Sequence, residues 1–257
     1  MHIDDIIHVA AEAGQIILEN GGETYRVEQT IIMICKSYGI PLTESFVTPT
    51  GIMVSITNSE NQTISLVKRI NTRTFNLRKV SMINNLSREI VLNPLSMEDM
   101  RKELAYINTL PPYSQKTTTF FAALSCGSFA ILFGGNYKDF LIAFLIGALI
   151  NTLSGSLDKL DVNGFLKNML SGALAALIAL ISTSLNFAGN MDTIIIASIM
   201  ILVPGISITN AIRDTIAGDL VSGVSRSIEA LFTAMAIAAG TSVVFKIWTL
   251  LFGGALI

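Results

Sequence analysis

The chain has 257 residues, of which 51% are hydrophobic and 14% are charged, and its mean hydropathy is +0.60. This composition is too apolar for a soluble globular protein, so it excludes that class and predicts membrane-spanning segments. The net charge of −2 excludes a nucleic-acid partner, because the chain has no basic stripe to neutralise phosphates.

The charged residues are unevenly distributed along the chain. Residues 1–116 carry 11 of the 17 Lys and Arg residues and 12 of the 19 Asp and Glu residues. The sequence therefore predicts a polar domain over residues 1–112, ending at Pro111-Pro112, and a membrane domain over residues 113–257. The first residues are acidic and amphipathic and lack the basic segment of a signal peptide, which predicts that the polar domain stays in the cytosol.

No pattern typical of an enzyme occurs in the polar half, and no pattern typical of a metal site occurs in the sequence. Cys35 and Cys126 lie far apart and are predicted to be reduced thiols, while His2 and His8 have no Cys or carboxylate cluster at metal-ligand spacing. Phosphate loops, nucleophile elbows and catalytic triads leave no signature either. We therefore expect no metal, no cofactor and no enzymatic activity.

The polar domain is predicted to have an α+β fold. Apolar residues follow a helical period over residues 3–19, 23–38 and 77–90, and Ser96 begins a last helix with a capping pattern. Between these helices the sequence is rich in Val, Ile, Thr and Ser, with turn residues separating the segments. Three antiparallel strands in meander order are expected, at Ser45–Thr48, Gly51–Thr57 and Thr63–Arg69.

The second half predicts an α-helical membrane domain with five transmembrane helices. The apolar runs cover about 118–135, 140–157, 165–187, 193–212 and 228–252. Most are long enough to cross about 30 Å of hydrocarbon at 1.5 Å per residue. Basic residues are more frequent in the connections on the same side as the polar domain, which predicts that the N-terminus lies on the inner side of the membrane.

The fourth run differs from the others because polar residues fill its second part. Residues 202–232 contain the only proline of the C-terminal half, several glycines and five ionisable groups. Charge is costly at membrane depth, and a Pro-Gly pair interrupts backbone hydrogen bonding, so the stretch is a functional candidate. An ordinary cytosolic loop between two membrane helices is the alternative. The predicted substrate or ion pathway comprises Asn210, Arg213, Asp214, Asp219, Arg226 and Glu229, and the predicted helix break comprises Pro204, Gly205, Gly218 and Gly223.

Chemical roles follow from the residue types in this stretch. Asn210 and Asp214 share a helix face, and Arg226 and Glu229 lie close enough on a helix to form a pair. Asp214 or Glu229 is a candidate proton acceptor if it is partly desolvated. An arginine is a candidate ligand for a substrate carboxylate.

Two separated motifs resemble the threonine/serine exporter family. They are GGETYRVEQTI at residues 21–31 and PGISITNAIRDTIAGDLVSGVSRSIEA at residues 204–230. The chain resembles the split form of the family, in which a second, shorter membrane chain supplies the rest of the transporter. The resemblance places Glu23, Arg26 and Glu28 in the first motif, as a cytosolic motif without an assigned role.

The resemblance implies secondary export of small polar metabolites from a bacterial cytoplasm across the cytoplasmic membrane, with serine, threonine or a dicarboxylate such as succinate as cargo. The expected function is therefore a proton-coupled exporter subunit that works in the lipid bilayer with the second membrane chain, or also as a homo-oligomer. The alternatives are a membrane-tethered enzyme and a sensor or gate, each acting through the cytosolic domain.

Overall fold

The computed structural model describes residues 2–187 and 189–252, which form two compact units. The first unit contains residues 1–112 together with residues 205–228, and the second contains residues 113–204 and 229–257. Residues 205–228, which the sequence placed in the membrane domain, thus pack with the polar half of the chain.

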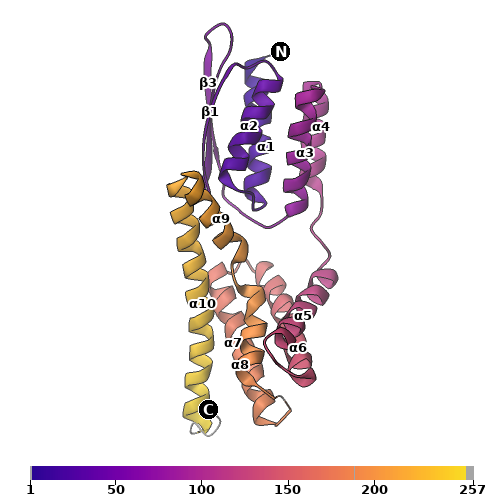
Figure 1. The fold of residues 1–257 in the computed structure, drawn as a ribbon, viewed down its shortest axis with the longest axis vertical. Helices are drawn as coiled ribbons and strands as arrows, with labels where there is room; N and C mark the ends of the chain where they lie inside the picture. The colour runs from indigo at the N-terminus through magenta and orange to yellow at the C-terminus, as the bar shows by residue number, and fades with distance from the viewer. Residues whose placement is uncertain (1, 188, 253–257) are drawn as a thin grey trace. The chain divides into compact units, whose positions relative to one another are not determined.

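The first unit is an α+β fold built on a three-stranded sheet (Figure 1). The strands β1 (Leu42–Thr48), β2 (Gly51–Thr57) and β3 (Thr63–Arg69) are antiparallel in the order β1-β2-β3, which confirms the predicted meander. The first strand begins three residues earlier than predicted. Phe46 is paired with Met53, and Met53 with Val67.

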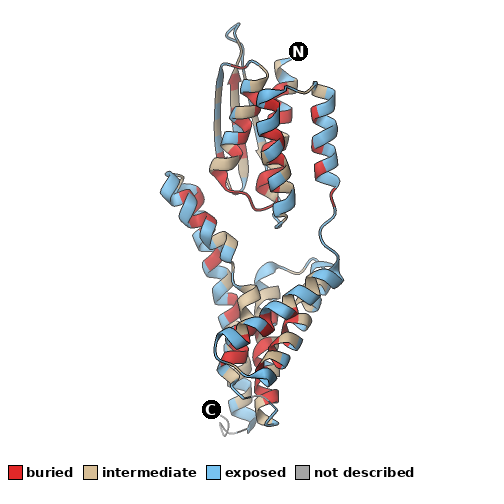
Figure 2. Cartoon of the chain, turned by 45° about the vertical axis from the view of Figure 1, so that its right-hand side comes forward, coloured by how far each residue is buried: buried red, intermediate tan, exposed pale blue. Residues whose placement is uncertain are grey.

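Four helices of the first unit lie on one side of this sheet, and two of them contact it. They are α1 (Ile3–Glu19), α2 (Thr24–Ser37), α3 (Leu77–Leu92) and α4 (Met97–Thr109). α1 and α2 contact the sheet, and α3 and α4 pack against α1. Buried apolar residues concentrate along α1 and α2 (Figure 2), as their helical period predicts. Ser96 caps α4 by accepting a hydrogen bond from the Asp99 N–H, as expected.

Two further elements complete the first unit. α9 (Gly205–Ala217) and the first residues of α10 (Leu220–Phe252) follow one another with only Gly218 and Asp219 between them. α10 has 33 residues and is about 50 Å long at 1.5 Å per residue, which exceeds the ~30 Å of a bilayer's hydrocarbon. The predicted helix at 228–252 therefore begins eight residues earlier.

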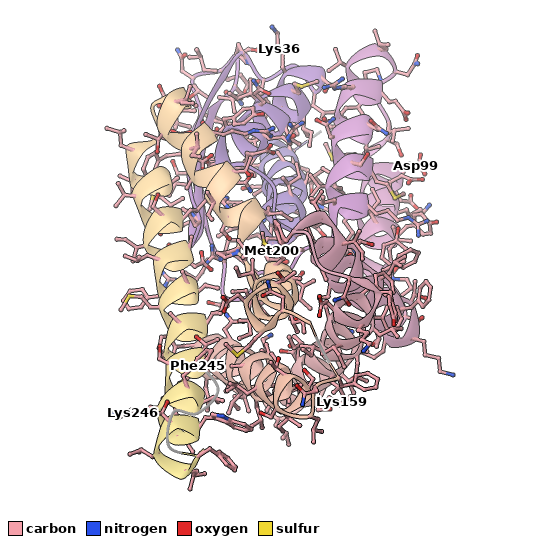
Figure 3. The ribbon with its side chains drawn as sticks, turned by 60° about the horizontal axis from the view of Figure 1, so that its bottom comes forward. Lys36, Asp99, Lys159, Met200, Phe245 and Lys246 are labelled. Carbon is pink, nitrogen blue, oxygen red and sulfur yellow. The ribbon has the colours of Figure 1, made fainter. Side chains whose placement is uncertain are left out.

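The second unit is a bundle of apolar helices. It contains α5 (Gln115–Leu132), α6 (Tyr137–Asp158), α7 (Gly164–Ser184), α8 (Met191–Ile199), the short 3-10 helix η1 (Met200–Leu202) and the rest of α10. Figure 3 labels Met200, where α8 passes into η1, and Phe245 and Lys246, which are consecutive residues of α10. Phe245 packs against the core formed by α6, α7 and α8, whereas Lys246 is exposed.

Five membrane spans are not confirmed. Within the described residues, α6, α7 and α10 are long and apolar enough to cross a membrane, and a fourth candidate exists if α8–η1 and α9 count as one span. These two parts are bent by 59° at the break after Leu202, where Pro204 has no N–H to continue the helix. α5 is not apolar enough to count among these candidates, because it begins with the polar run Gln115–Thr119.

Candidate functional site

The loop between α1 and α2 presents backbone carbonyls to residues from the C-terminal half. Gly21 has a φ of +91°, a conformation that glycine adopts without strain. A Cβ on Gly22 would lie 2.2 Å from Ile17 Cγ2, so the loop can pass this close to α1 only with glycine. The carbonyl oxygens of both glycines accept hydrogen bonds at 3.0 Å, from Asn210 Nδ2 and Arg226 Nη2 respectively.

α9 and α10 come close together because of two further glycines. Gly218, at a φ of +95°, makes the turn between the helices. Gly223 lies inside α10 and not at a helix break, and its missing side chain makes room for α9. A Cβ there would lie 2.1 Å from Thr215 Oγ1 and 3.1 Å from the Ala211 carbonyl oxygen. This approach brings Asp214 of α9 next to Arg226 of α10.

Asp214 and Arg226 form a buried ion pair. Arg226 Nε lies 3.0 Å from Asp214 Oδ2, and the two side chains are 5% and 0% exposed, respectively. Thr24 Oγ1 donates to Asp214 Oδ1 at 2.9 Å. Thr24 is the first residue of α2, so the carboxylate also lies at a helix N-terminus, where the helix dipole favours negative charge. The contact between Arg226 Nε and Asp214 Oδ2 is a charge contact without hydrogen-bond geometry, and the two side chains form their hydrogen bonds to Thr24 and to the Gly22 carbonyl instead.

Contacts around the ion pair extend to β1. Ser222 Oγ donates to the Val47 carbonyl oxygen at 3.3 Å, and the Val47 N–H donates to Glu28 Oε1 at 3.0 Å. Thr24 Oγ1 also lies 3.4 Å from Asp219 Oδ2. The first motif and the second motif, about 190 residues apart in the chain, therefore share one polar cluster.

Glu23 joins two arginines at the edge of this cluster. Its Oε2 accepts from Arg26 Nε at 2.8 Å and its Oε1 from Arg213 Nη1 at 2.5 Å. Burial raises the pKa of Glu23, but hydrogen bonds from Arg26, the backbone and Arg213, together with the charge of Arg26, outweigh burial and lower it below 4.5. Glu23 therefore stays ionised and fixes both guanidinium groups.

The structure does not bring all the predicted residues together. Pro204 and Glu229 belong to the second unit, and Glu229 is exposed. The sequence suggested Glu229 as a partner of Arg226, and in the structure Arg226 Nε lies 3.0 Å from Asp214 Oδ2. Residues 21–24 contact five of the predicted residues directly: Asn210, Arg213, Asp214, Asp219 and Arg226.

Sequence reasoning missed Thr24 and the carbonyl groups that receive the second motif. Thr24 lies within the first motif. The one local feature that could have indicated its role is its position at the start of α2, two residues after Gly21-Gly22. Carbonyls of Gly21, Gly22 and Val47 carry no signal in the sequence, because every residue has one. In the described part of the chain no group of three or more His, Cys, Asp or Glu residues is placed to hold a metal ion.

Glu28 predicts a pH dependence of stability. Burial raises its pKa above 4.5, the Val47 hydrogen bond opposes this increase, and the Asp219 and Asp214 carboxylates add to it. An acid whose pKa is raised by folding destabilises the folded state once it ionises, and has no such effect below its ordinary pKa. We expect Glu28→Gln, which keeps the acceptor for Val47, to raise the melting temperature at pH 7.5.

The advantage of this variant over the wild type should shrink as the pH falls, because a growing fraction of the wild-type Glu28 carboxyl is then protonated. Thermal melts of both proteins between pH 7.5 and 4.5 measure the difference. Glu60→Gln, in the exposed turn between β2 and β3, is the matched control. A Glu28→Gln advantage that is absent, or that does not change with pH, would contradict the prediction.

The apolar helices of membrane length, with an α+β unit that packs against α9 and the start of α10, define a helical membrane protein. A family model described as "Putative threonine/serine exporter" matches residues 8–248. The chain belongs to the threonine/serine exporter family.

Individual relatives have modest sequence identity. The chain is 25% identical over 242 residues to the "Threonine/serine exporter" of Corynebacterium glutamicum, covering 91% of this chain and 50% of that protein. It is 20% identical over 243 residues to the "Probable threonine/serine exporter" of Mycobacterium tuberculosis, covering 93% of this chain and 46% of that protein. It is 22% identical over 246 residues to the "Probable succinate transporter subunit YjjP" of Escherichia coli, covering 95% of both chains.

The chain thus spans about half the length of the two exporters and nearly the whole length of the subunit. No solved structure matches the chain significantly.

Proposed function

We propose that the chain is one subunit of a secondary transporter that exports small polar metabolites from the bacterial cytoplasm. The observation that carries the proposal is the buried Asp214–Arg226 pair in a chain of this family. Asp214 lies on α9, which follows the break at Pro204, and it contacts Thr24 of the first motif. Serine, threonine and succinate are the cargo candidates, because the relatives' names contain them.

A second membrane chain completes the transporter in this proposal. Two exporters of the family are about twice as long as this chain, whereas the relative of equal length is named a transporter subunit. Many transporters are also built from two related halves. The proposed subunit has residues 1–112 in the cytosol, as the distribution of basic residues predicts.

α9 is the element that we propose to move during transport. Its polar face meets residues 21–24, while Ile208, Ile212 and Ile216 on the opposite face are 41%, 56% and 81% exposed. The Pro204 break precedes this helix and Gly218 follows it, so both ends can change direction without breaking helical hydrogen bonds. A short amphipathic helix of this kind, attached through side chains and not through an apolar core, is suited to change position.

Asp214 is the residue that we propose to couple movement to the proton gradient. Protonation of its carboxyl would remove the charge that holds Arg226, and with it the attraction between α9 and α10. The hydrogen bond from Arg226 to the Gly22 carbonyl and the contact of Thr24 with Asp219 would remain. Each protonation cycle would therefore loosen and restore the docked state of α9.

Efflux from proteoliposomes tests the proposal. We expect labelled serine, threonine or succinate to leave vesicles that contain this chain and its partner membrane chain when a proton gradient is imposed, and a protonophore should abolish the efflux. Lys102→Gln, which removes an exposed ion pair on α4, is the control variant and should transport like the wild type. Absence of efflux of all three compounds with the partner present would refute the proposal.

A further inference from the structure

A cavity of about 420 Å³ adjoins the polar cluster within the first unit. It is lined by residues 21–23, by Leu77 and Val80 of α3, and by α9 residues between Gly205 and Arg213. Its volume lies within the range of roughly 300–1,000 Å³ that is typical of sites for small molecules. The two family motifs thus enclose a space that neither motif forms alone.

Two charged side chains of opposite sign line this cavity, Glu23 and Arg213. The Arg213 side chain is 54% exposed, and its one hydrogen bond among the described residues uses Nη1. A guanidinium has five N–H donors in a planar fork, so Arg213 can still receive a carboxylate. The two oxygens of Glu23 each accept one hydrogen bond, and a carboxylate has room for about four.

We propose that this cavity binds a small zwitterionic amino acid, with its carboxylate on Arg213 and its ammonium group on Glu23. The inference rests on the proposed transport function and specifies the class of cargo that the site takes. Arg26, Glu23 and Arg213 already form a series of alternating positive and negative charges. The ligand's carboxylate would follow Arg213 in this series, and its ammonium group would pair with Glu23. Each charge of the ligand then has an opposite partner, and the site as a whole gains no net charge.

A dicarboxylate fits the same cavity poorly. Two carboxylates require two available cations, but Arg213 is the one cationic residue that lines the cavity in the described chain. Arg26 is directed to Glu23, and Arg226 to Asp214 and the Gly22 carbonyl. The second carboxylate would also face Glu23, which stays ionised because its pKa is lowered. Like charges at this separation repel strongly when they are partly removed from water.

The remaining walls limit the size of the ligand's side chain. Leu77, Val80 and Ile206 provide an apolar side, and Thr209 and Asn210 provide a polar one. The Asn210 amide already donates to the Gly21 carbonyl, which holds α9 against the loop and closes one side of the cavity. A short side chain can therefore occupy the space, while a long one would extend past Arg213 into the solvent.

Equilibrium binding to the purified full-length chain in nanodiscs tests this assignment. The probes are L-serine, serinamide, which lacks the carboxylate, glycerate, which lacks the ammonium group, and succinate. We expect saturable binding of serine and at least tenfold weaker binding of the other three. Arg213→Gln should weaken serine binding at least tenfold, and Thr209→Trp should do so by filling the cavity without changing its charge.

Glu23→Gln separates charge recognition from shape. It should weaken serine binding and reduce the preference for serine over glycerate at least threefold, because the neutral amide no longer repels an anion. Lys102→Gln is the control and should bind serine like the wild type. Thermal melts verify that each variant is folded.

Three outcomes would overturn the assignment. They are succinate binding as tight as serine binding, no saturable serine binding, and wild-type serine affinity in both folded Arg213→Gln and Thr209→Trp. Efflux of any cargo together with one of these outcomes would refute the zwitterion site and leave the transport function standing. Serine binding at this cavity without efflux of any cargo would refute the transport function instead.

Discussion

Asp214→Ala is expected to lower the stability of the first unit by about 3–5 kcal/mol, because it leaves Arg226 as a buried charge without the carboxylate that it pairs with. The variant also removes the acceptor of the Thr24 hydroxyl and the negative charge at the N-terminus of α2. α9 should then detach more readily. Thermal melting by circular dichroism and limited trypsin digestion, which reports cleavage after Arg213 and Arg226, measure the effect.

A double-mutant cycle distinguishes the ion pair from a general packing defect. Asp214→Leu combined with Arg226→Met replaces the pair with apolar side chains and should cost less than the sum of the two single changes, by about 1–3 kcal/mol. The matched control is Arg101→Ala, which breaks an exposed ion pair with Asp5 and should cost at most about 1 kcal/mol. Additive single effects, or an Asp214→Ala melt like that of Arg101→Ala, would contradict the prediction.

Gly223→Ala is expected to destabilise the docking of α9 on α10 by about 1–3 kcal/mol, the usual cost of overpacking. The new methyl group would lie 2.1 Å from Thr215 Oγ1 and 3.1 Å from the Ala211 carbonyl oxygen, so α9 has to shift. This change acts against the general rule that Gly→Ala favours a helix by about 0.5–1 kcal/mol. The melting temperature and the rates of trypsin cleavage after Arg213 in α9 and after Arg226 in α10 are the measurements.

Gly205→Ala provides a control of the same chemistry, because a Cβ there meets no atom within 4 Å. It should leave stability unchanged or slightly increased. Combining Gly223→Ala with Thr215→Ala removes the closest clash and should restore part of the loss, while the contact with the Ala211 carbonyl remains. Equal melting temperatures for Gly223→Ala and Gly205→Ala would show that the helices do not approach as described.

The helices and strands of the polar half were predictable because their signals are local. The helical period over residues 3–19 and the capping pattern at Ser96 depend on side chains within a few positions, and both are found in the structure. The interruption at residues 203–204 was equally local, since proline lacks an N–H wherever it occurs. The polar start of α5 was visible too, and because α5 is not among the helices that are long and apolar enough to cross a membrane, the five expected spans are not confirmed.

The arrangement of the site was not predictable from these signals. Residue types alone indicated that Asn210, Asp214 and Arg226 were unusual for an apolar segment, and the resemblance indicated that residues 21–31 belonged with them in one family. Neither observation placed Asp214 against Thr24, across 190 positions of the chain. Sequence spacing suggested Glu229 as a partner of Arg226, because i, i+3 neighbours on one helix are close, but it gave no indication of the contact between Arg226 and Asp214.

Only the tertiary structure decided which groups meet, because a buried charge is stabilised by whichever opposite charge and hydrogen-bond donors the packed helices bring near it. Gly22 and Gly223 allow that packing because their missing side chains let Gly22 approach Ile17 of α1 and let Gly223 approach Thr215 and Ala211 of α9. Composition and periodicity therefore established a membrane protein with a polar α+β part. Long-range packing turned two separate motifs into one charged site beside one cavity.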